Sequence, residues 1–187
     1  MTGQLIYLVG PSGSGKDSIL RELAPRLGDK YTILKRVISR PPAMETEDFE
    51  SLDLADFLER EGKGEFSLSW RANNLAYGVR TELDQQLALG KTVIVNGSRE
   101  HWPQVFARYP SAILLLVQVN AALLEQRLRA RGRESEQEIQ LRLERNVSME
   151  RTLRDTAALQ KHAFWIIDNS NDLSTAVEAF HRQLKEI

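Results

Sequence analysis

The sequence predicts a single α/β domain of three layers, α/β/α, in which a parallel five-stranded core sheet lies between two layers of helices. Two observations predict this fold. Short, nearly continuous apolar runs alternate with segments of helical periodicity, which is typical of strands that are buried on both faces and joined by helices. The chain also has 187 residues, of which 42% are hydrophobic and 27% charged, and this size and balance suit one folded core.

The first third of the chain predicts two core strands with a helix between them. Residues 5–9 form an apolar run that ends at a glycine, as expected of a buried strand. A helix follows, with its apolar face over 19–27 and Gly28 as its stop. Residues 31–39 form a second extended segment, which ends at the prolines 41–42.

The middle of the chain predicts an excursion from the core sheet at about 40–80. The acidic stretch 45–50 has the composition of an exposed loop. Asp53 can cap a short helix that stops at Gly62, and residues 66–70 alternate between apolar and polar side chains as a strand does.

The remaining elements return to the core. In order they are a helix over 81–89, strands over 92–95 and 112–119, a helix over 121–131, a long polar helix from Ser135, a strand over 164–167 and a helix over 173–184. Ser135 and Glu138 have the spacing of a capping box. Gly132 separates the two middle helices, so we expect a second excursion at about 125–150.

A phosphate-binding loop carries the chemistry. It matches the pattern G-x-x-x-x-G-K and consists of Gly10, Pro11, Ser12, Gly13, Ser14, Gly15 and Lys16. The glycines let backbone N–H groups turn towards a polyphosphate, the lysine reaches its outer phosphates, and the next helix adds its N-terminal dipole. The loop lies directly between an apolar strand and a helix, as this mechanism requires.

The position after the lysine departs from the usual Ser or Thr that helps to hold Mg²⁺. This chain has Asp17 there, followed by Ser18. A carboxylate is a hard oxygen ligand, so our hypothesis is that Asp17 positions Mg²⁺ and that Ser18 bonds an inner phosphate. The alternative is that Asp17 only caps the helix and balances the charge of Lys16.

Arginine is the dominant cation, because 18 of the 25 basic residues are Arg. Its guanidinium binds phosphate oxygens bidentately. Arg131 and Arg133 flank Gly132, and Arg142 lies on the following helix. These three arginines could close over the loop, exclude water and neutralise a transferring phosphoryl group. The arginines that glutamates surround are expected to form a solvated face with surface ion pairs; they are Arg127, Arg129 and Arg145.

Four motifs resemble the guanylate kinase superfamily and span nearly the whole chain in family order. They are the loop at 10–16, Ser39-Arg40-Pro41, Tyr77-Gly78-Val79, and Arg131-Gly132-Arg133 with 139–143. The resemblance implies a P-loop NTPase fold of the nucleoside monophosphate kinase type, with an acceptor-binding insert at about 40–80 and a lid at about 125–150.

Within this superfamily the chain is most similar to the ribose 1,5-bisphosphate phosphokinases. The motifs that carry this similarity are the loop with its Asp17-Ser18, Leu68-Ser69-Trp70, Val95-Asn96-Gly97-Ser98-Arg99 and Arg131-Gly132-Arg133-Glu134. The similarity implies Mg²⁺-dependent phosphorylation of ribose 1,5-bisphosphate by ATP to 5-phospho-ribose 1-diphosphate (PRPP), in phosphonate breakdown. The nucleophile would be an oxygen of the 1-phosphate, which is anionic near neutral pH because its second pKa is about 6. No general base is needed, and the three histidines form no recognisable constellation.

These resemblances imply a role for each candidate residue. Lys16, Arg131 and Arg142 would be catalytic. The loop residues 10–18 and Arg133 would bind ATP. The substrate-binding candidates are Arg40, Tyr77, Asn96, Ser98 and Arg99, with Arg40 and Arg99 at the acceptor phosphates and Asn96 and Ser98 at ribose hydroxyls or a metal-bound water; for Arg99 a surface position is the alternative.

The departures from guanylate kinases argue against guanine as the acceptor's base. Guanylate kinases bind the guanine base with a Glu that precedes their Tyr-Gly motif and with an Asp at the end of the next core strand. In our alignment the corresponding residues of this chain are Arg71 and Asn96. An arginine accepts no hydrogen bond from guanine. The family's second acceptor-phosphate arginine is also missing, with Ala43 nearby. A guanylate or other nucleoside monophosphate kinase remains the alternative, and the intact loop disfavours a non-catalytic interaction module.

Charge and composition exclude other classes. A net charge of −1 argues against a nucleic-acid binder, and the absence of cysteine excludes disulfides and Cys-based zinc sites. The apolar runs are too short for a signal segment or a membrane span, so we expect a cytoplasmic protein without a membrane partner. The sequence leaves a monomer and a homodimer open. The tryptophans are expected in the core or at its edge, and Asn169 and Asn171 near the adenine.

Overall fold

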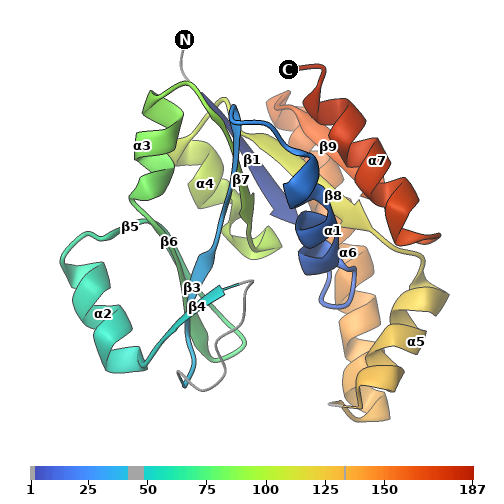
Figure 1. The fold of residues 1–187 in the computed structure, drawn as a ribbon. Coiled ribbons are helices and arrows are strands. Elements are labelled where there is room, and N and C mark those ends of the chain that lie inside the picture. The colour runs from blue at the N-terminus through green and yellow to red at the C-terminus, as the bar shows by residue number, and fades with distance from the viewer. Residues whose placement is uncertain (1–2, 42–48, 133) are drawn as a thin grey trace.

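The computed structural model describes residues 3–41, 49–132 and 134–187 and confirms the three-layer α/β/α fold (Figure 1). The core sheet has five strands, and all of its neighbouring strands are parallel. Across the sheet their order is β2 (Tyr31–Leu34), β7 (Thr92–Asn96), β1 (Gln4–Val9), β8 (Ile113–Gln118) and β9 (Phe164–Asp168).

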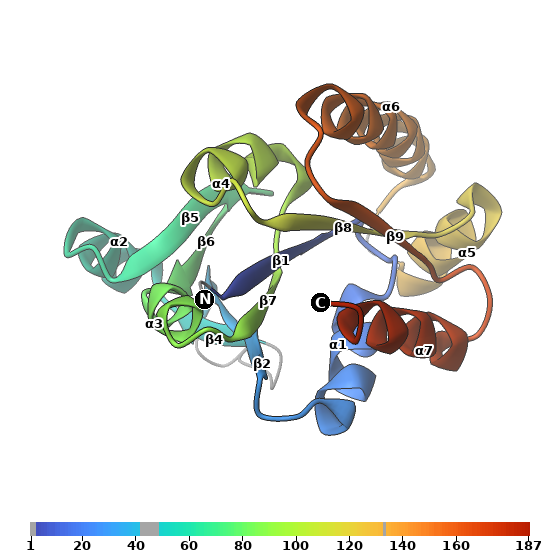
Figure 2. The same cartoon turned by 90° about the horizontal axis from the view of Figure 1, so that it is seen from above.

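Helices cover both faces of this sheet (Figure 2). Alternate residues of β1 face opposite sides, so Ile6 and Leu8 belong to one core cluster and Tyr7 to the other. The first cluster packs under α1 (Lys16–Leu23) and α7 (Leu173–Leu184). The second packs under α3 (Glu82–Ala88), α4 (Trp102–Arg108) and α6 (Glu136–Gln160). Burial of apolar surface on both faces explains why the core strands are nearly continuous apolar runs.

A second sheet forms the predicted excursion after the first two core strands. Its order is β4 (Phe49–Leu52), β3 (Arg36–Ser39), β6 (Leu75–Arg80) and β5 (Phe66–Ala72), with α2 (Leu54–Gly62) packed beside it. Only the β3–β4 pair is parallel; β6 is antiparallel to both of its neighbours. On the other side of the molecule, α5 (Ala121–Arg131) and α6 form a helical pair.

Several local predictions were wrong. The segment 31–39 is two strands, because the chain leaves the core sheet at Lys35 and continues in the second sheet. Helix α1 ends at Leu23 in a short 3₁₀ turn, since Pro25 has no N–H to continue the helix. Strand β6 and helix α4 were missed, and Phe49 and Glu50 lie in a strand rather than a loop. The rest of the predicted acidic loop, with Pro42 and Ala43, lies outside the described residues.

The predicted helix starts were correct. The Asp53 carboxylate accepts a hydrogen bond from the Asp56 N–H at 2.8 Å. Ser135 and Glu138 form the full capping box at the start of α6. Helix α6 has 25 residues but is polar, and no helix in the described part of the chain has the length and apolarity needed to cross a membrane.

Candidate active site

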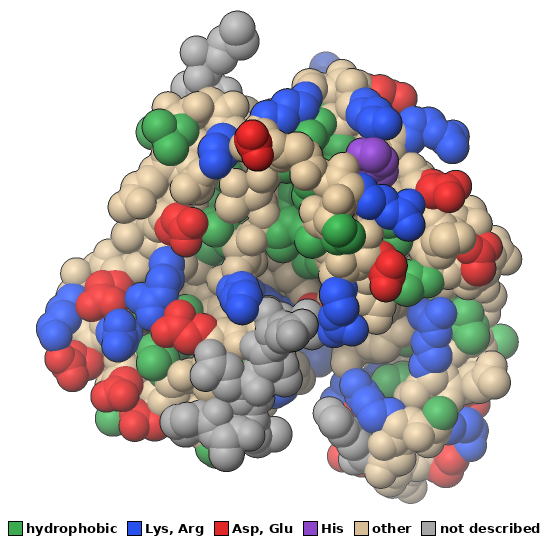
Figure 3. Space-filling view, in the orientation of Figure 1, with side chains coloured by type: hydrophobic (Ala, Val, Ile, Leu, Met, Phe, Trp, Pro, Cys, Tyr) green, Lys and Arg blue, Asp and Glu red, His purple; other side chains and the backbone are tan. Residues whose placement is uncertain are grey.

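A cleft of about 860 Å³ opens at the carboxyl ends of β1 and β7. It lies between the second sheet and the α5–α6 pair, where Figure 3 shows the molecule hollowed and Lys and Arg side chains at the edges of the hollow. The predicted site residues that line it are Gly10, Ser12, Gly13, Gly15, Lys16, Asp17, Ser18, Arg40, Tyr77, Asn96, Ser98, Arg99, Arg131 and Arg142. Pro11 and Ser14 are buried within the loop, and Arg133 lies outside the described residues.

The phosphate loop is held from behind by two side chains. Gly15 has φ 87°, and a Cβ there would collide with the Asn169 side chain, so only glycine fits. Asn169 is 3% exposed and donates to the Ser14 carbonyl oxygen at 2.7 Å. Arg127 donates to the carbonyl oxygens of Gly13 and Asn169 at 3.2 and 3.3 Å. Asn169 therefore supports the loop, and the expectation that Arg127 belongs to a solvated ion-pair face was wrong.

The Lys16 ammonium bends back over the loop. It donates to the carbonyl oxygens of Gly10 and Pro11 at 2.8 and 3.0 Å. Burial lowers the pKa of Lys16 to about 7; Asp17 raises this pKa, and the positive charges of Arg36 and Arg99 lower it further. An anionic triphosphate would stabilise the ammonium form of this side chain.

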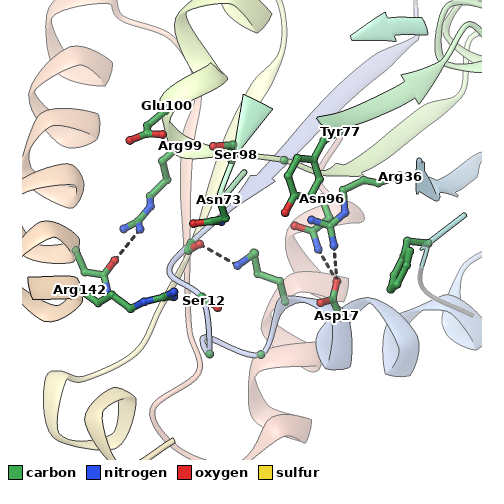
Figure 4. A pocket seen from close by; sticks show the side chains of 18 of the residues that line it. Ser12, Asp17, Arg36, Asn73, Tyr77, Asn96, Ser98, Arg99, Glu100 and Arg142 are labelled. Atoms are coloured by element: carbon green, nitrogen blue, oxygen red, sulfur yellow. Dashed lines mark hydrogen bonds and ion pairs between the residues drawn. The ribbon is translucent and has the colours of Figure 1, made fainter. Parts of the chain in front are cut away.

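Asp17 lies between two side chains that donate to the same carboxylate oxygen. Arg36 Nη2 is 3.3 Å and Asn96 Nδ2 is 2.5 Å from Asp17 Oδ1 (Figure 4). No hydrogen bond or ion pair reaches the other oxygen, Oδ2, from any described residue. Asp17 therefore does more than balance the charge of Lys16, because its side chain is hydrogen-bonded to Arg36 and Asn96.

The donor set fits a magnesium ion that is shared with a nucleotide. Within the described ranges, no group of three or more His, Cys, Asp or Glu could hold a metal by itself. Mg²⁺ commonly keeps several waters and takes one or two carboxylates besides the substrate's phosphate oxygens. The Asp17 side chain is 50% exposed at the end of the loop and can supply one such carboxylate.

Two arginines of the α5–α6 pair converge on the loop. Arg131 Nη1 donates to Ser12 Oγ at 3.1 Å, and its Nη2 lies 2.6 Å from Glu134 Oε1. Arg142 Nη2 lies 3.3 Å from the same Glu134 oxygen. The Glu134 side chain is only 8% exposed, so one buried carboxylate holds both arginines at the edge of the cleft.

The second sheet supplies the opposite wall. Tyr77 stacks on Trp70 with ring centroids 5.4 Å apart, and Arg40 lies over the ring of Phe49 at 5.4 Å. Trp70 also stacks on His101 at 5.3 Å and lines the cleft, so it is an edge residue of the core.

Arg71 does not lie in the cleft. Strand alternation turns it to the far side of β5, where it pairs with Glu61 at 2.5 Å, and Ala72 faces the cleft instead. The alignment of Arg71 with a guanine-reading position was therefore wrong. Of the described residues that line the cleft, only Asp17 and Glu100 carry a carboxylate, and Glu100 pairs with Arg145.

The segment after β7 is fixed by a buried tyrosine. Tyr7 accepts a hydrogen bond from the Ser98 N–H at 3.0 Å, and burial raises the Tyr7 pKa. A Cβ at Gly97 would overlap the Tyr7 ring. Arg99 reaches towards α6 (Figure 4). It donates to Asn146 Oδ1 at 2.6 Å. Burial lowers the Arg99 pKa to about 10, with a contribution from Arg145, so the guanidinium stays charged at neutral pH.

The sequence reasoning assigned no role to Arg36, Glu134 or Asn146. The strand pattern could have identified Arg36. It comes two residues before Ile38 and four before Arg40, so the alternation of a strand predicts that all three side chains face the same side, and all three line the cleft. Asn146 meets Arg99 only through tertiary packing, across 47 residues of sequence. No local pattern indicates that contact.

Comparisons with known proteins agree with this geometry. Residues 5–156 match the family described as the AAA domain. A Pseudomonas fluorescens protein named ribose 1,5-bisphosphate phosphokinase PhnN is 44% identical over 95% of this chain and 93% of its own length. A protein of the same name from Pseudomonas paraeruginosa is 43% identical over 96% of this chain and 94% of its own length. The crystal structure of guanylate kinase from Anaplasma phagocytophilum has a similar fold, with a TM-score of 0.71 over 99% of this chain and 86% of that chain, at 15% identity.

Proposed function

The chain carries the AAA domain and belongs to the ribose 1,5-bisphosphate phosphokinase family, and from this premise we propose that it transfers the γ-phosphoryl group of ATP to ribose 1,5-bisphosphate. The products are PRPP and ADP. An oxygen of the 1-phosphate forms a bond to the γ-phosphorus as the bond to the bridging oxygen of ADP breaks. Both substrates are small molecules, and the cytoplasm, in phosphonate breakdown, is the proposed setting.

The observation that carries this proposal is the charge of the cleft. Lys16 and seven arginines line it, against two carboxylates, among the described residues. Four phosphoryl groups must come together when ATP meets the 1-phosphate, and a fifth stands at C5, so the acceptor itself needs cationic contacts. No described residue beside Tyr77 offers guanine a carboxylate.

The nucleotide occupies the phosphate loop in this proposal. Lys16 turns from the loop carbonyls to the β- and γ-phosphates, and the N-terminus of α1 adds its dipole. Arg131 and Arg142 neutralise the charge that develops on the transferring group. Mg²⁺, held by Asp17 and the phosphate oxygens, supplies further charge neutralisation when it is bound.

The acceptor occupies the wall formed by the second sheet and the segment after β7. Arg40 and Arg99 bind acceptor phosphates, Tyr77 borders the sugar, and Asn96 and Ser98 face the ribose hydroxyls. No histidine lines the described part of the cleft, which agrees with a nucleophile that needs no general base. Catalysis then depends on alignment and on fixed charge.

Coupled ADP-release kinetics with ATP and Mg²⁺ test the proposal, with ribose 1,5-bisphosphate and GMP compared at equal concentration. We expect kcat/KM to be at least about 100-fold higher for ribose 1,5-bisphosphate, since a mismatched polar site loses about 3 kcal/mol or more. Faster turnover of GMP would instead identify a guanylate kinase. Absence of nucleotide binding by calorimetry would identify a non-catalytic module.

A further inference from the structure

A three-residue junction joins the phosphate loop to the second sheet. Arg36 comes from the start of β3, Asn96 from the end of β7 and Asp17 from the first turn of α1. Figure 4 shows the Arg36 guanidinium and the Asn96 amide side by side, and both donate to Asp17 Oδ1. Arg36 lines the cleft, but none of the substrate contacts proposed above involves it.

Each of the two donors has a further polar atom that is buried and unsatisfied. Arg36 Nε and Asn96 Oδ1 have no hydrogen-bond partner among the described residues. The Arg36 side chain is 15% exposed, and Asn96 is 3% exposed. Buried polar atoms are nearly always paired, so two adjacent exceptions at the wall of a ligand cleft mark contacts that a ligand completes.

The chemistry of this pair is specific. Arg36 offers a charged donor, and Asn96 offers a neutral acceptor beside it. A sugar phosphate matches both, since the phosphate accepts from a guanidinium and the neighbouring hydroxyl donates to an amide oxygen. An inorganic cation would match only the Asn96 oxygen, because a guanidinium repels it.

We propose that Arg36 binds the 1-phosphate of the acceptor, with Asn96 on the adjacent ribose hydroxyl, and that Asp17 holds Arg36 in place until the acceptor enters. This inference rests on the proposed function, and it names the residue that binds the 1-phosphate, whose oxygen is the nucleophile of the proposed reaction. The position suits that role, because Arg36 is hydrogen-bonded to Asp17, the residue next to Lys16. Arg36 therefore lies where the two substrates would meet. The 1-phosphate and the Asp17 carboxylate compete for the same Arg36 guanidinium. The phosphate must therefore displace Asp17 from Arg36 or bind Arg36 together with it.

Binding measurements without nucleotide test the assignment of Arg36. Calorimetry would compare ribose 1,5-bisphosphate with ribose 5-phosphate, which lacks only the 1-phosphate. Arg36→Met should weaken ribose 1,5-bisphosphate by about tenfold or more and ribose 5-phosphate by less than about twofold. Arg71→Met is the matched control, since Arg71 lies on the same sheet but outside the cleft, and it should change neither affinity.

A double-mutant cycle tests the role of Asp17. Asp17→Asn should tighten ribose 1,5-bisphosphate severalfold in the absence of Mg²⁺ and nucleotide, because Arg36 loses its competing partner. That gain should vanish when Arg36→Met is also present. If Arg36→Met fails to fold, Arg36→Lys serves, and it should lose severalfold because lysine lacks the Nε–H donor.

Two outcomes would overturn the inference. One is an equal loss of both ligands, or no loss, in the Arg36 variants; the other is a gain from Asp17→Asn that persists without Arg36. Either could occur while ribose 1,5-bisphosphate remains the preferred substrate of the unaltered enzyme. Failure of the proposed function itself would show separately, as a preference of that enzyme for GMP in the ADP-release assay.

Discussion

Glu134 should increase the rate of phosphoryl transfer, although it contacts neither substrate. Its buried carboxylate holds Arg131 at 2.6 Å and Arg142 at 3.3 Å, and Arg131 in turn contacts Ser12 of the phosphate loop. Glu134→Gln keeps the shape but removes the charge that keeps two guanidiniums together. We expect the two arginines to separate and to spend less time in the position from which they neutralise the transferring group.

The size of the effect follows from the exposure of the two contacts. A charge-assisted hydrogen bond contributes about 1.5–3 kcal/mol, and the partly exposed Arg142 contact, at 38% exposure and the longer distance, contributes well under 1 kcal/mol. Since glutamine still offers one acceptor oxygen, a net loss of about 1–2 kcal/mol is expected, which lowers kcat about 5- to 30-fold.

Steady-state kinetics with ribose 1,5-bisphosphate and ATP measure this change. The fall should appear in kcat more than in the KM for the acceptor, and thermal unfolding should shift little. Glu125→Gln is the matched control, because Glu125 pairs with Arg129 at 2.8 Å and neither residue lines the cleft. A kcat for Glu134→Gln within twofold of the unaltered enzyme would refute the reasoning.

Three further predictions follow from the loop and its supports. The Lys16 pKa of about 7 means that the free enzyme has mostly lost this proton at pH 8, whereas bound triphosphate favours the ammonium form. ATP binding at pH 8 should therefore be accompanied by proton uptake, and the affinity for ATP should fall as the pH rises above 7. Calorimetry in two buffers of different ionisation enthalpy checks this, and equal proton uptake in Lys16→Met would contradict it. Gly97→Ala should lower the free energy of unfolding by about 1–3 kcal/mol, because the added methyl overlaps the buried Tyr7 ring; an unchanged urea midpoint would contradict this. Asn169→Ala leaves the Ser14 carbonyl oxygen without its 2.7 Å donor and should weaken ATP about 3- to 10-fold by equilibrium titration, while Asn171→Ala should have little effect; equal effects would contradict the support role.

The sequence predicted the core because its signals are local. A short apolar run followed by a glycine loop and an amphipathic helix has one stable arrangement, and β1, the loop and α1 follow it. Caps are equally local, so Asp53 and Ser135 were found correctly. The second sheet was harder to predict, since β6 contains Gly78, a weak strand former that leaves room for the nearby ring of Phe66.

The site was predictable where a motif holds its residues together and unpredictable where tertiary contacts do. The loop and the strand-end residues could be named in advance. The contacts of Arg36 with Asp17, of Arg127 with Gly13 and of Arg99 with Asn146 join segments between 19 and 114 residues apart. Glu134 was quoted in a motif, but its burial between two arginines depends on how α5 and α6 pack.

Phosphorus NMR of the reaction tests the central claim most directly. The enzyme would be incubated with ATP, Mg²⁺ and ribose 1,5-bisphosphate, and the products would be followed through their phosphorus couplings. The account predicts that the 1-phosphate singlet is replaced by two coupled resonances of a diphosphate on C1, that the 5-phosphate signal persists, and that ADP forms in equal amount. An unchanged 1-phosphate signal, together with conversion of GMP to GDP under the same conditions, would contradict it.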